Sequence, residues 1–276
     1  IDRDHKEYEE LEELFNRFRS QTQGTWIVNS SQRRTKRLTE SQINDFGEDP
    51  NCGYYIHDYR INDFQCQFKV NKTSVTLPIP GLHNAYNATA AISAAVSCGI
   101  SIDDAAQAIS TYPGIHRRMQ LLGQANDVTL IDDYAHNPAK IIAAIQTAQS
   151  MSPRIHAYFQ PHGFAPTQFM RQELIQLLSE SLRPEDTMWM SDIYYVGGTA
   201  KKDISAEDLI LDLAQSHSLS FYHADREVVA ENMSKMSQSG DIILLMGARD
   251  PSLEDFARQV WDIHLKSKNN NLAKST

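Results

Sequence analysis

The sequence contains little cysteine, and its cysteines show no metal-binding pattern. Cys52, Cys66 and Cys98 are the only three in 276 residues. They lie far apart, without the short ligand spacings of structural zinc sites. An odd, sparse count is typical of a reducing compartment, where disulfides are rare. We therefore interpret the cysteines as packing residues.

An excess of positive charge and long hydrophobic runs are absent as well. The formal net charge is −9, which argues against a nucleic-acid partner held by a basic surface but leaves room for a local phosphate pocket. No apolar run approaches the roughly 20 residues of a membrane-spanning helix, and no signal peptide is visible. We therefore expect a cytoplasmic protein without a membrane partner.

The first 113 residues mix helices with short strands. Apolar spacing predicts an amphipathic helix over residues 6–20, and Thr25–Asn29 is expected to form a short strand. Alternating patterns predict strands between Cys52 and Pro78. Two helices should follow, at residues 84–98 and after Ser101, where the hydroxyl can cap the helix. Pro113-Gly114 breaks the pattern, so we place a domain boundary between residues 1–113 and 114–276.

The second part alternates strand and helix, which predicts an α/β fold with a doubly wound, mostly parallel, Rossmann-like sheet. The expected strands are Val128–Asp132, Ile155–Gln160, Thr187–Ser191, Leu219–Tyr222 and Ile242–Met246. The expected helices are Ala139–Ser150, Gln168–Ser181, Ala206–Ser216, Glu227–Met236 and Leu253–Leu265, followed by a polar tail.

The most informative segment is Ile131–Pro138, where a buried strand runs into Asp132, Asp133, Tyr134 and His136. Ligands of open α/β sheets bind beyond the carboxyl ends of the strands. The segment is therefore a candidate for catalysis. An equally acceptable interpretation is that the two aspartates only cap the helix that begins near Pro138.

Two further segments are candidates for ligand binding. Asn84 and Asn87 are three residues apart, so in a helix they share one face and could read a base edge, although Asn84 alone is also a good N-cap. Arg117 and Arg118 alternate faces in an extended chain, so one could bind an anion while the other packs or stays solvated.

Taken in order, these segments resemble the Mur ligases, the ATP-dependent amide ligases that add amino acids to peptidoglycan precursors. The patterns His-Asn-x-x-Asn, Arg-Arg-Met-Gln and Asp-Tyr-Ala-His-x-Pro occur here at similar separations, and Phe159–His162 resembles the branch that adds L-alanine to UDP-N-acetylmuramate. The resemblance implies that residues 1–113 are part of a central ATP-binding domain and residues 114–276 a C-terminal ligase domain.

The resemblance also implies roles for individual residues. His5 matches a histidine that helps hold Mg²⁺, and Asn84 and Asn87 match asparagines on the adenine side of ATP. Arg118 matches an arginine that reaches the nucleotide phosphates, and Asp133 matches an aspartate that contacts ribose. The positions that meet the incoming amino acid are His136, Tyr134 and His162. The implied chemistry activates a carboxylate as an acyl phosphate, which an amine then attacks.

Two departures from the family pattern stand out. No Gly-x-x-Gly-Lys-Thr/Ser phosphate loop is present, and Gly197–Lys201 does not supply its spacing. We therefore expect this chain to be the later part of a longer protein and, by itself, to bind ATP poorly. Gly163 and Pro166 stand where the alanine-adding branch has arginines, so the acceptor could differ or be gripped elsewhere, for example by Lys201 and Lys202, which could equally form a solvated pair.

Two alternative functions remain open at this point. One is the ligase activity that recycles a murein tripeptide onto UDP-N-acetylmuramate. The other is a binding module that retained the fold without catalysis. All three hypotheses imply small-molecule ligands.

Overall fold

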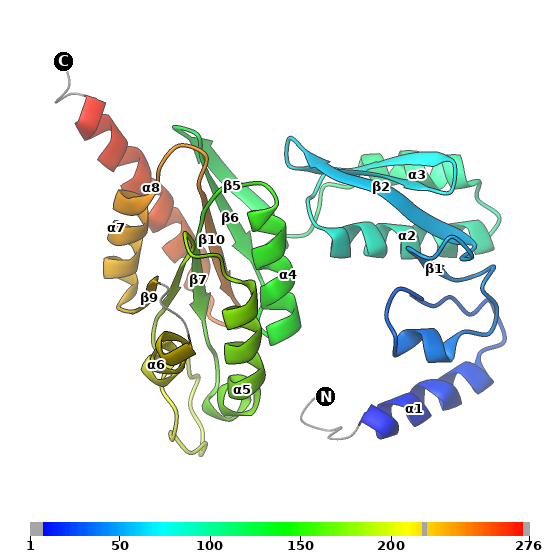
Figure 1. Ribbon diagram of the computed structural model, residues 1–276, viewed down its shortest axis with the longest axis horizontal. Helices are drawn as coiled ribbons and strands as arrows, with labels where there is room; N and C mark the ends of the chain where they lie inside the picture. The colour runs from blue at the N-terminus through cyan, green and yellow to red at the C-terminus, as the bar shows by residue number, and fades with distance from the viewer. Residues whose placement is uncertain (1–7, 217–219, 273–276) are drawn as a thin grey trace. The chain divides into compact units, whose positions relative to one another are not determined.

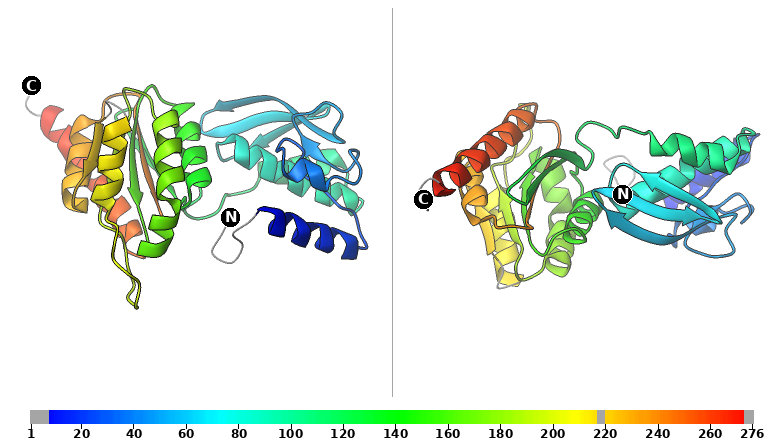
Figure 2. Two further views of the ribbon diagram at one scale, coloured as in Figure 1. Left: turned by 60° about the horizontal axis from the view of Figure 1, so that its bottom comes forward. Right: turned by 90° about the horizontal axis from the view of Figure 1, so that it is seen from above.

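The computed structural model describes residues 8–216 and 220–272. The chain divides into two compact units, Ile1–Pro113 and Gly114–Thr276, which we call unit 1 and unit 2 and describe separately. Figures 1 and 2 show their elements. Among the described residues, no helix combines the length and apolar character that crossing a membrane requires.

Unit 1 is built on a four-stranded sheet in the order β1-β2-β3-β4. Strand β1 lies parallel to β2, and the other neighbours are antiparallel. The strands are β1 (Phe46–Gly47), β2 (Tyr54–Asn62), β3 (Gln65–Val70) and β4 (Thr73–Leu77). The helices are α1 (Tyr8–Gln21), the 3-10 helix η1 (Thr35–Leu38), α2 (Leu82–Ser97) and α3 (Ile102–Ser110). Alternate residues of β3 are buried, because one face of the sheet covers the core.

Helices α2 and α3 complete the core of unit 1. Ala85, Ala88 and Ile92 of α2 belong to one buried cluster with Phe68 and Val70 of β3. The expected cap of α3 is present, since Ser101 Oγ accepts a hydrogen bond from Asp104 N at 3.1 Å.

Unit 2 is a doubly wound α/β fold, as expected from the sequence. Its six-stranded sheet has the order β5-β6-β10-β7-β8-β9 and is parallel except for β5, which is antiparallel to β6. The strands are β5 (Gln120–Ala125), β6 (Val128–Asp133), β7 (Ile155–Gln160), β8 (Thr187–Met190), β9 (Ser220–His223) and β10 (Ile242–Gly247). The helices are α4 (Pro138–Gln149), α5 (Phe164–Ser181), α6 (Ala206–Ser216), α7 (Arg226–Met236) and α8 (Leu253–Leu272).

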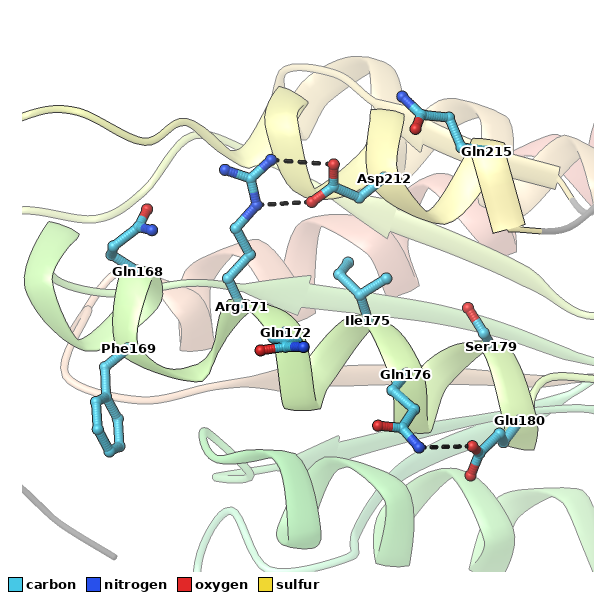
Figure 3. A pocket seen from close by; sticks show the side chains of 10 residues that line it. All are labelled: Gln168, Phe169, Arg171, Gln172, Ile175, Gln176, Ser179, Glu180, Asp212 and Gln215. Carbon is cyan, nitrogen blue, oxygen red and sulfur yellow. Dashed lines mark hydrogen bonds and ion pairs between the residues drawn. The ribbon is translucent and has the colours of Figure 1, made fainter. Parts of the chain in front are cut away.

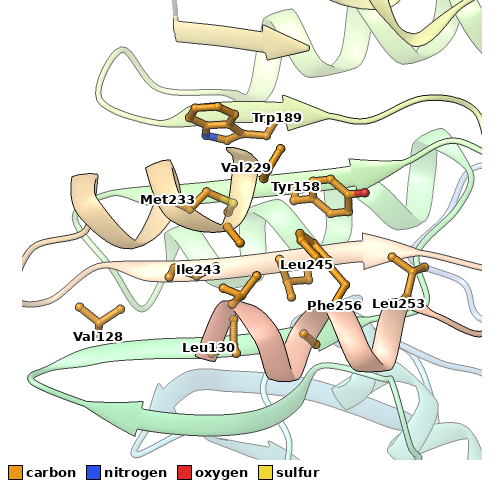
Figure 4. Close-up of a cluster of buried hydrophobic side chains, with 13 residues drawn as sticks. Val128, Leu130, Tyr158, Trp189, Val229, Met233, Ile243, Leu245, Leu253 and Phe256 are labelled. Carbon is orange, nitrogen blue, oxygen red and sulfur yellow. The ribbon is translucent and has the colours of Figure 1, made fainter. Parts of the chain in front are cut away.

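Helices cover both faces of this sheet. Figure 1 shows α4 and α5 on one face and α7 and α8 on the other. Every residue of β7 and β10 is therefore buried, which explains the continuous apolar run of β10. Figure 4 shows Leu130, Tyr158 and Ile243 of the sheet packed with Met233 of α7 and Phe256 of α8. Full burial of each such side chain contributes about 1.5–3 kcal/mol.

The order of the strands creates a topological switch point at their carboxyl ends. The chain passes from β6 through α4 to β7, and β10 later inserts between these two strands. The segments after β6 and β7 lead to helices on one face, whereas the segment after β10 leads to α8 on the other. Such a switch point is where open α/β sheets bind ligands.

One expected strand is wrong, and strands β1 and β5 were not expected. Thr25–Asn29 is not a strand, because only Asn29 pairs, in a single bridge with Phe46. Strand β5 was missed, since its residues are partly exposed and carry no clear alternation. The Asn126-Asp127 turn was an available signal: φ is +51° and +60° at these residues, as in the turns that close tight hairpins.

Candidate functional site

A buried ion pair holds the start of unit 2 against the strand ends. Arg117 Nε donates to Asp132 Oδ2 at 2.8 Å, and Arg117 Nη2 donates to the Gly247 carbonyl at 2.9 Å. The guanidinium therefore ties the end of β6 to the end of β10. Arg117 and Arg118 were expected in an extended segment. They lie instead in a turn, with φ of +56° at Arg117 and +44° at Met119.

Asp133 fixes the same turn from the other side. Its two carboxylate oxygens accept backbone hydrogen bonds from Met119 N and Ala135 N, each at 2.7 Å. Burial raises the pKa of this carboxyl, and the two N–H donors oppose the rise. The capping interpretation is wrong, because Asn137 caps α4 and accepts from Lys140 N at 3.0 Å.

Tyr134 contacts three arginines at the switch point of the sheet. The guanidinium carbons of Arg117 and Arg118 each lie 5.3 Å from its ring centroid, within the range of a cation–π interaction. Its hydroxyl oxygen accepts a hydrogen bond from Arg249 N at 3.3 Å. Arg117 is buried and paired, whereas Arg118 is half-buried. Of the two adjacent arginines, one packs and the other stays accessible.

His136 and His162 face each other, with ring centroids 5.7 Å apart. His136 Nδ1 lies 2.9 Å from the Tyr134 carbonyl. A carbonyl only accepts, so Nδ1 carries the proton in the neutral ring and Nε2 keeps a lone pair. Burial lowers the pKa of both histidines, and the positive charge of Arg249 lowers both further. The structure therefore favours two neutral imidazoles near pH 7.

The residues after β7 contain no cation that matches the missing arginines. Gly163 precedes α5 with φ of +70°, and Pro166 lies in the first turn of that helix, where proline is tolerated. Lys201 is exposed and pairs with Asp203 at 3.1 Å. Lys202 Nζ lies 5.7 Å from the Phe164 ring centroid and 5.4 Å from that of Tyr195. Lys201 is therefore a solvated residue, while Lys202 packs over two rings.

The candidate nucleotide residues of unit 1 have different environments. Gly81 precedes α2, so Asn84 is not its N-cap. The Asn84 side chain is 9% exposed, and its Nδ2 donates to the Pro80 carbonyl at 2.6 Å. Asn87, one turn further on, is exposed. His5, the candidate metal ligand, lies outside the described residues.

Two hollows on unit 2 differ in their position relative to the strand ends. A groove of about 760 Å³ runs between α5 and α6 and is spanned by the Arg171–Asp212 ion pair, on the outer surface of the helices (Figure 3). A second, of about 590 Å³, lies past the ends of β7 and β8 and includes Gln160, Tyr194 and Arg226. Arg226 binds both Gln160 and Asp250, a network that sequence reasoning missed. Only the second hollow adjoins the carboxyl ends of the strands.

Known proteins share both the sequence and the fold. Residues 117–249 match the family described as Mur ligase, glutamate ligase domain. The UDP-N-acetylmuramate–L-alanine ligase of Acetivibrio thermocellus is 35% identical over 197 residues, which are 71% of this chain and 40% of that protein. The chain spans about half the length of the curated relatives it matches.

Two solved structures from Thermotoga maritima support the fold. Its UDP-N-acetylmuramate–alanine ligase superposes with a TM-score of 0.68 at 21% identity, covering 95% of this chain and 56% of that one. Its MurF ligase, solved in complex with ADP, has a TM-score of 0.59 at 13% identity, covering 89% and 54%. These structures share the fold, and the matched domain together with the similar sequences shows that the chain belongs to the Mur ligase family.

Proposed function

We propose that the chain is part of a cytoplasmic, ATP-dependent amide ligase of peptidoglycan precursor synthesis. The intact enzyme would join an amino acid, L-alanine in the first instance, to UDP-N-acetylmuramate. The relatives named for this reaction support the proposal at up to 35% identity. The structural observation that carries it is that a half-buried Arg118 and His136 both adjoin the ring of Tyr134, at the switch point of the sheet.

The first step moves the terminal phosphoryl group of ATP. An oxygen of the substrate carboxylate attacks the γ-phosphorus, ADP leaves and an acyl phosphate forms. Such a step needs positioning and charge neutralisation more than a protein nucleophile. We assign Arg118 to the phosphates, Asn84 and Asn87 to adenine and Asp133 to ribose, as the resemblance implies. Mg²⁺, with His5 among its ligands, would supply further positive charge.

The second step forms the amide. The acceptor amine attacks the acyl carbon, a tetrahedral intermediate forms and inorganic phosphate leaves. An ammonium group has no lone pair, so the acceptor must first lose a proton. We assign this proton to His136 Nε2, because Nδ1 is committed to the Tyr134 carbonyl. Tyr134 and His162 complete the surroundings of the acceptor.

The test uses the full-length protein that carries this chain. It is incubated with ATP, Mg²⁺, UDP-N-acetylmuramate and a panel of amino acids and murein peptides, and phosphate release is followed. We expect release that requires both the nucleotide sugar and one amino acid, and that is lost in Arg118→Gln but kept in Arg258→Gln. Stimulation by a tripeptide instead would identify a recycling ligase. Release that no acceptor stimulates would refute the ligase assignment.

A further inference from the structure

Among the residues that the structure describes, two arginines of unit 2 make no ion pair with a carboxylate, unlike the others. Six of its arginines pair with an aspartate or glutamate: Arg117, Arg154, Arg171, Arg183, Arg226 and Arg258. Within the described residues, the guanidinium groups of Arg118 and Arg249 make no ion pair. Both exceptions border Tyr134. Two guanidinium groups without an ion pair therefore lie near the ends of β6 and β10, although the Asp133 carboxylate still acts electrostatically on Arg118.

The backbone at Arg249 is held in a conformation that suits glycine better than arginine. Its φ is +65°, a region that side chains other than glycine rarely occupy. Arg249 keeps this conformation because hydrogen bonds hold its own N–H and that of the next residue. Its N–H donates to the Tyr134 hydroxyl oxygen, and Asp250 N donates to the Ala248 carbonyl at 2.8 Å. Strained residues that the surroundings over-determine are often found at ligand sites.

The position of Arg249 distinguishes its ligand from that of Arg118. Arg118 belongs to the turn before β5, whereas Arg249 follows β10 and acts electrostatically on both His136 and His162. An α-amino acid carries its amine and its carboxylate on the same carbon. If His136 takes the proton of the amine, the carboxylate must lie only a few ångströms away. The backbone of Arg249 bonds the hydroxyl of Tyr134, and the ring of Tyr134 lies 5.6 Å from that of His136, so Arg249 is a cation of this neighbourhood, whereas the segment Gly163–Pro166 offers none.

We propose that Arg249 binds the α-carboxylate of the acceptor amino acid, with the Tyr134 hydroxyl as a second donor. The inference rests on the ligase function proposed above. The guanidinium donates a bidentate pair of hydrogen bonds, which orients the amine toward the acyl phosphate. The Tyr134 hydroxyl oxygen accepts from Arg249 N, and its own proton remains available for a carboxylate oxygen. Arg249 is thus a specificity residue for acceptors with a free carboxylate.

Arg249→Gly in the full-length protein tests this role, because glycine accepts the positive φ while removing the guanidinium. Rates are measured with the preferred amino acid and with its carboxamide, which retains the amine but lacks the anion. We expect the wild type to prefer the acid. In Arg249→Gly, kcat/KM for the acid should fall roughly 10- to 100-fold, while the rate with the amide and the KM for ATP change little. Arg258→Gln, which removes an exposed arginine of α8, is the matched control.

Each outcome separates this inference from the function on which it rests. A wild-type protein without acceptor-dependent turnover refutes the ligase function. An active wild type whose preference for acid over amide survives in Arg249→Gly refutes the role of Arg249 alone. A variant that raises the KM for ATP instead would assign the arginine to phosphate, which also overturns the proposal. Retained thermal stability of the variant shows that lost activity does not reflect unfolding.

Discussion

The Arg117 guanidinium and the Asp132 carboxylate form a buried ion pair, with 8% and 4% of their side chains exposed. The pair joins residues 15 positions apart and adds a hydrogen bond to Gly247 of β10. It thereby anchors the turn that carries Arg118 to the carboxyl edge of the sheet. The buried Arg117, which no ligand can reach, therefore fixes the position of Arg118.

Breaking this pair should destabilise unit 2. We expect Arg117→Ala to lower the free energy of unfolding by about 3–5 kcal/mol, because Asp132 is left buried without its partner. Urea denaturation measures the change. The double variant Arg117→Met/Asp132→Leu should be less destabilised, since neither charge is then unpaired. Equal losses in the single and double variants would contradict this account.

Asp133→Ala should affect both folding and nucleotide binding. Loss of the ribose contact that the family resemblance implies for Asp133 would by itself weaken nucleotide affinity and leave stability unchanged. The hydrogen bonds from Met119 N and Ala135 N argue otherwise, because the variant leaves two buried donors unpaired. We predict a loss of roughly 2–4 kcal/mol in unfolding free energy, together with a weaker ATP Kd. Asp255→Ala, at an exposed position of α8, is the control. If Asp133→Ala were as stable as this control, the hydrogen bonds of Asp133 to the two backbone N–H groups would not stabilise the fold.

Substitutions of the two asparagines of α2 should differ in their effect on stability. Asn87 is exposed, so Asn87→Ala should weaken ATP binding in the full-length protein without altering the melting temperature. Asn84 is buried and bonded to Pro80, so Asn84→Ala should cost about 1 kcal/mol of stability as well. Calorimetric titration and thermal melting provide the two readouts. An Asn87→Ala variant with unchanged affinity would remove that residue from the nucleotide site.

The pH dependence of kcat/KM should reflect a neutral His136. Because its folded-state pKa lies below the ordinary 6.5, the base stays unprotonated to lower pH, and activity should fall only as pH drops through that lowered value. The charges that lower it include those of Lys140, Arg118 and Arg249. Lys140→Gln removes one of them and should move the acid limb to higher pH. The control Lys235→Gln removes a lysine that pairs with Glu231 on α7 and should leave the profile unchanged. An acid limb that Lys140→Gln does not move would contradict the electrostatic argument.

The sequence by itself determined the elements whose signals are local. The buried runs of β6, β7 and β10 could be read because a parallel sheet covered on both faces leaves apolar side chains on each. The cap at Ser101 is also predictable from the sequence, because it involves residues only three positions apart. Ordered motifs also brought Arg118, Asp133 and His136 to attention before their environment was known.

Only the tertiary structure decided what those motif residues do to one another. Asp132 and Asp133 are adjacent, yet one pairs with Arg117 and the other accepts from Met119 and Ala135. No periodicity encodes such pairings, because they depend on which strand ends become neighbours in the sheet. The same applies to Arg249, because its place near Tyr134 depends on the position of β10 between β6 and β7. Strand order brings distant residues together, and local sequence patterns do not specify it.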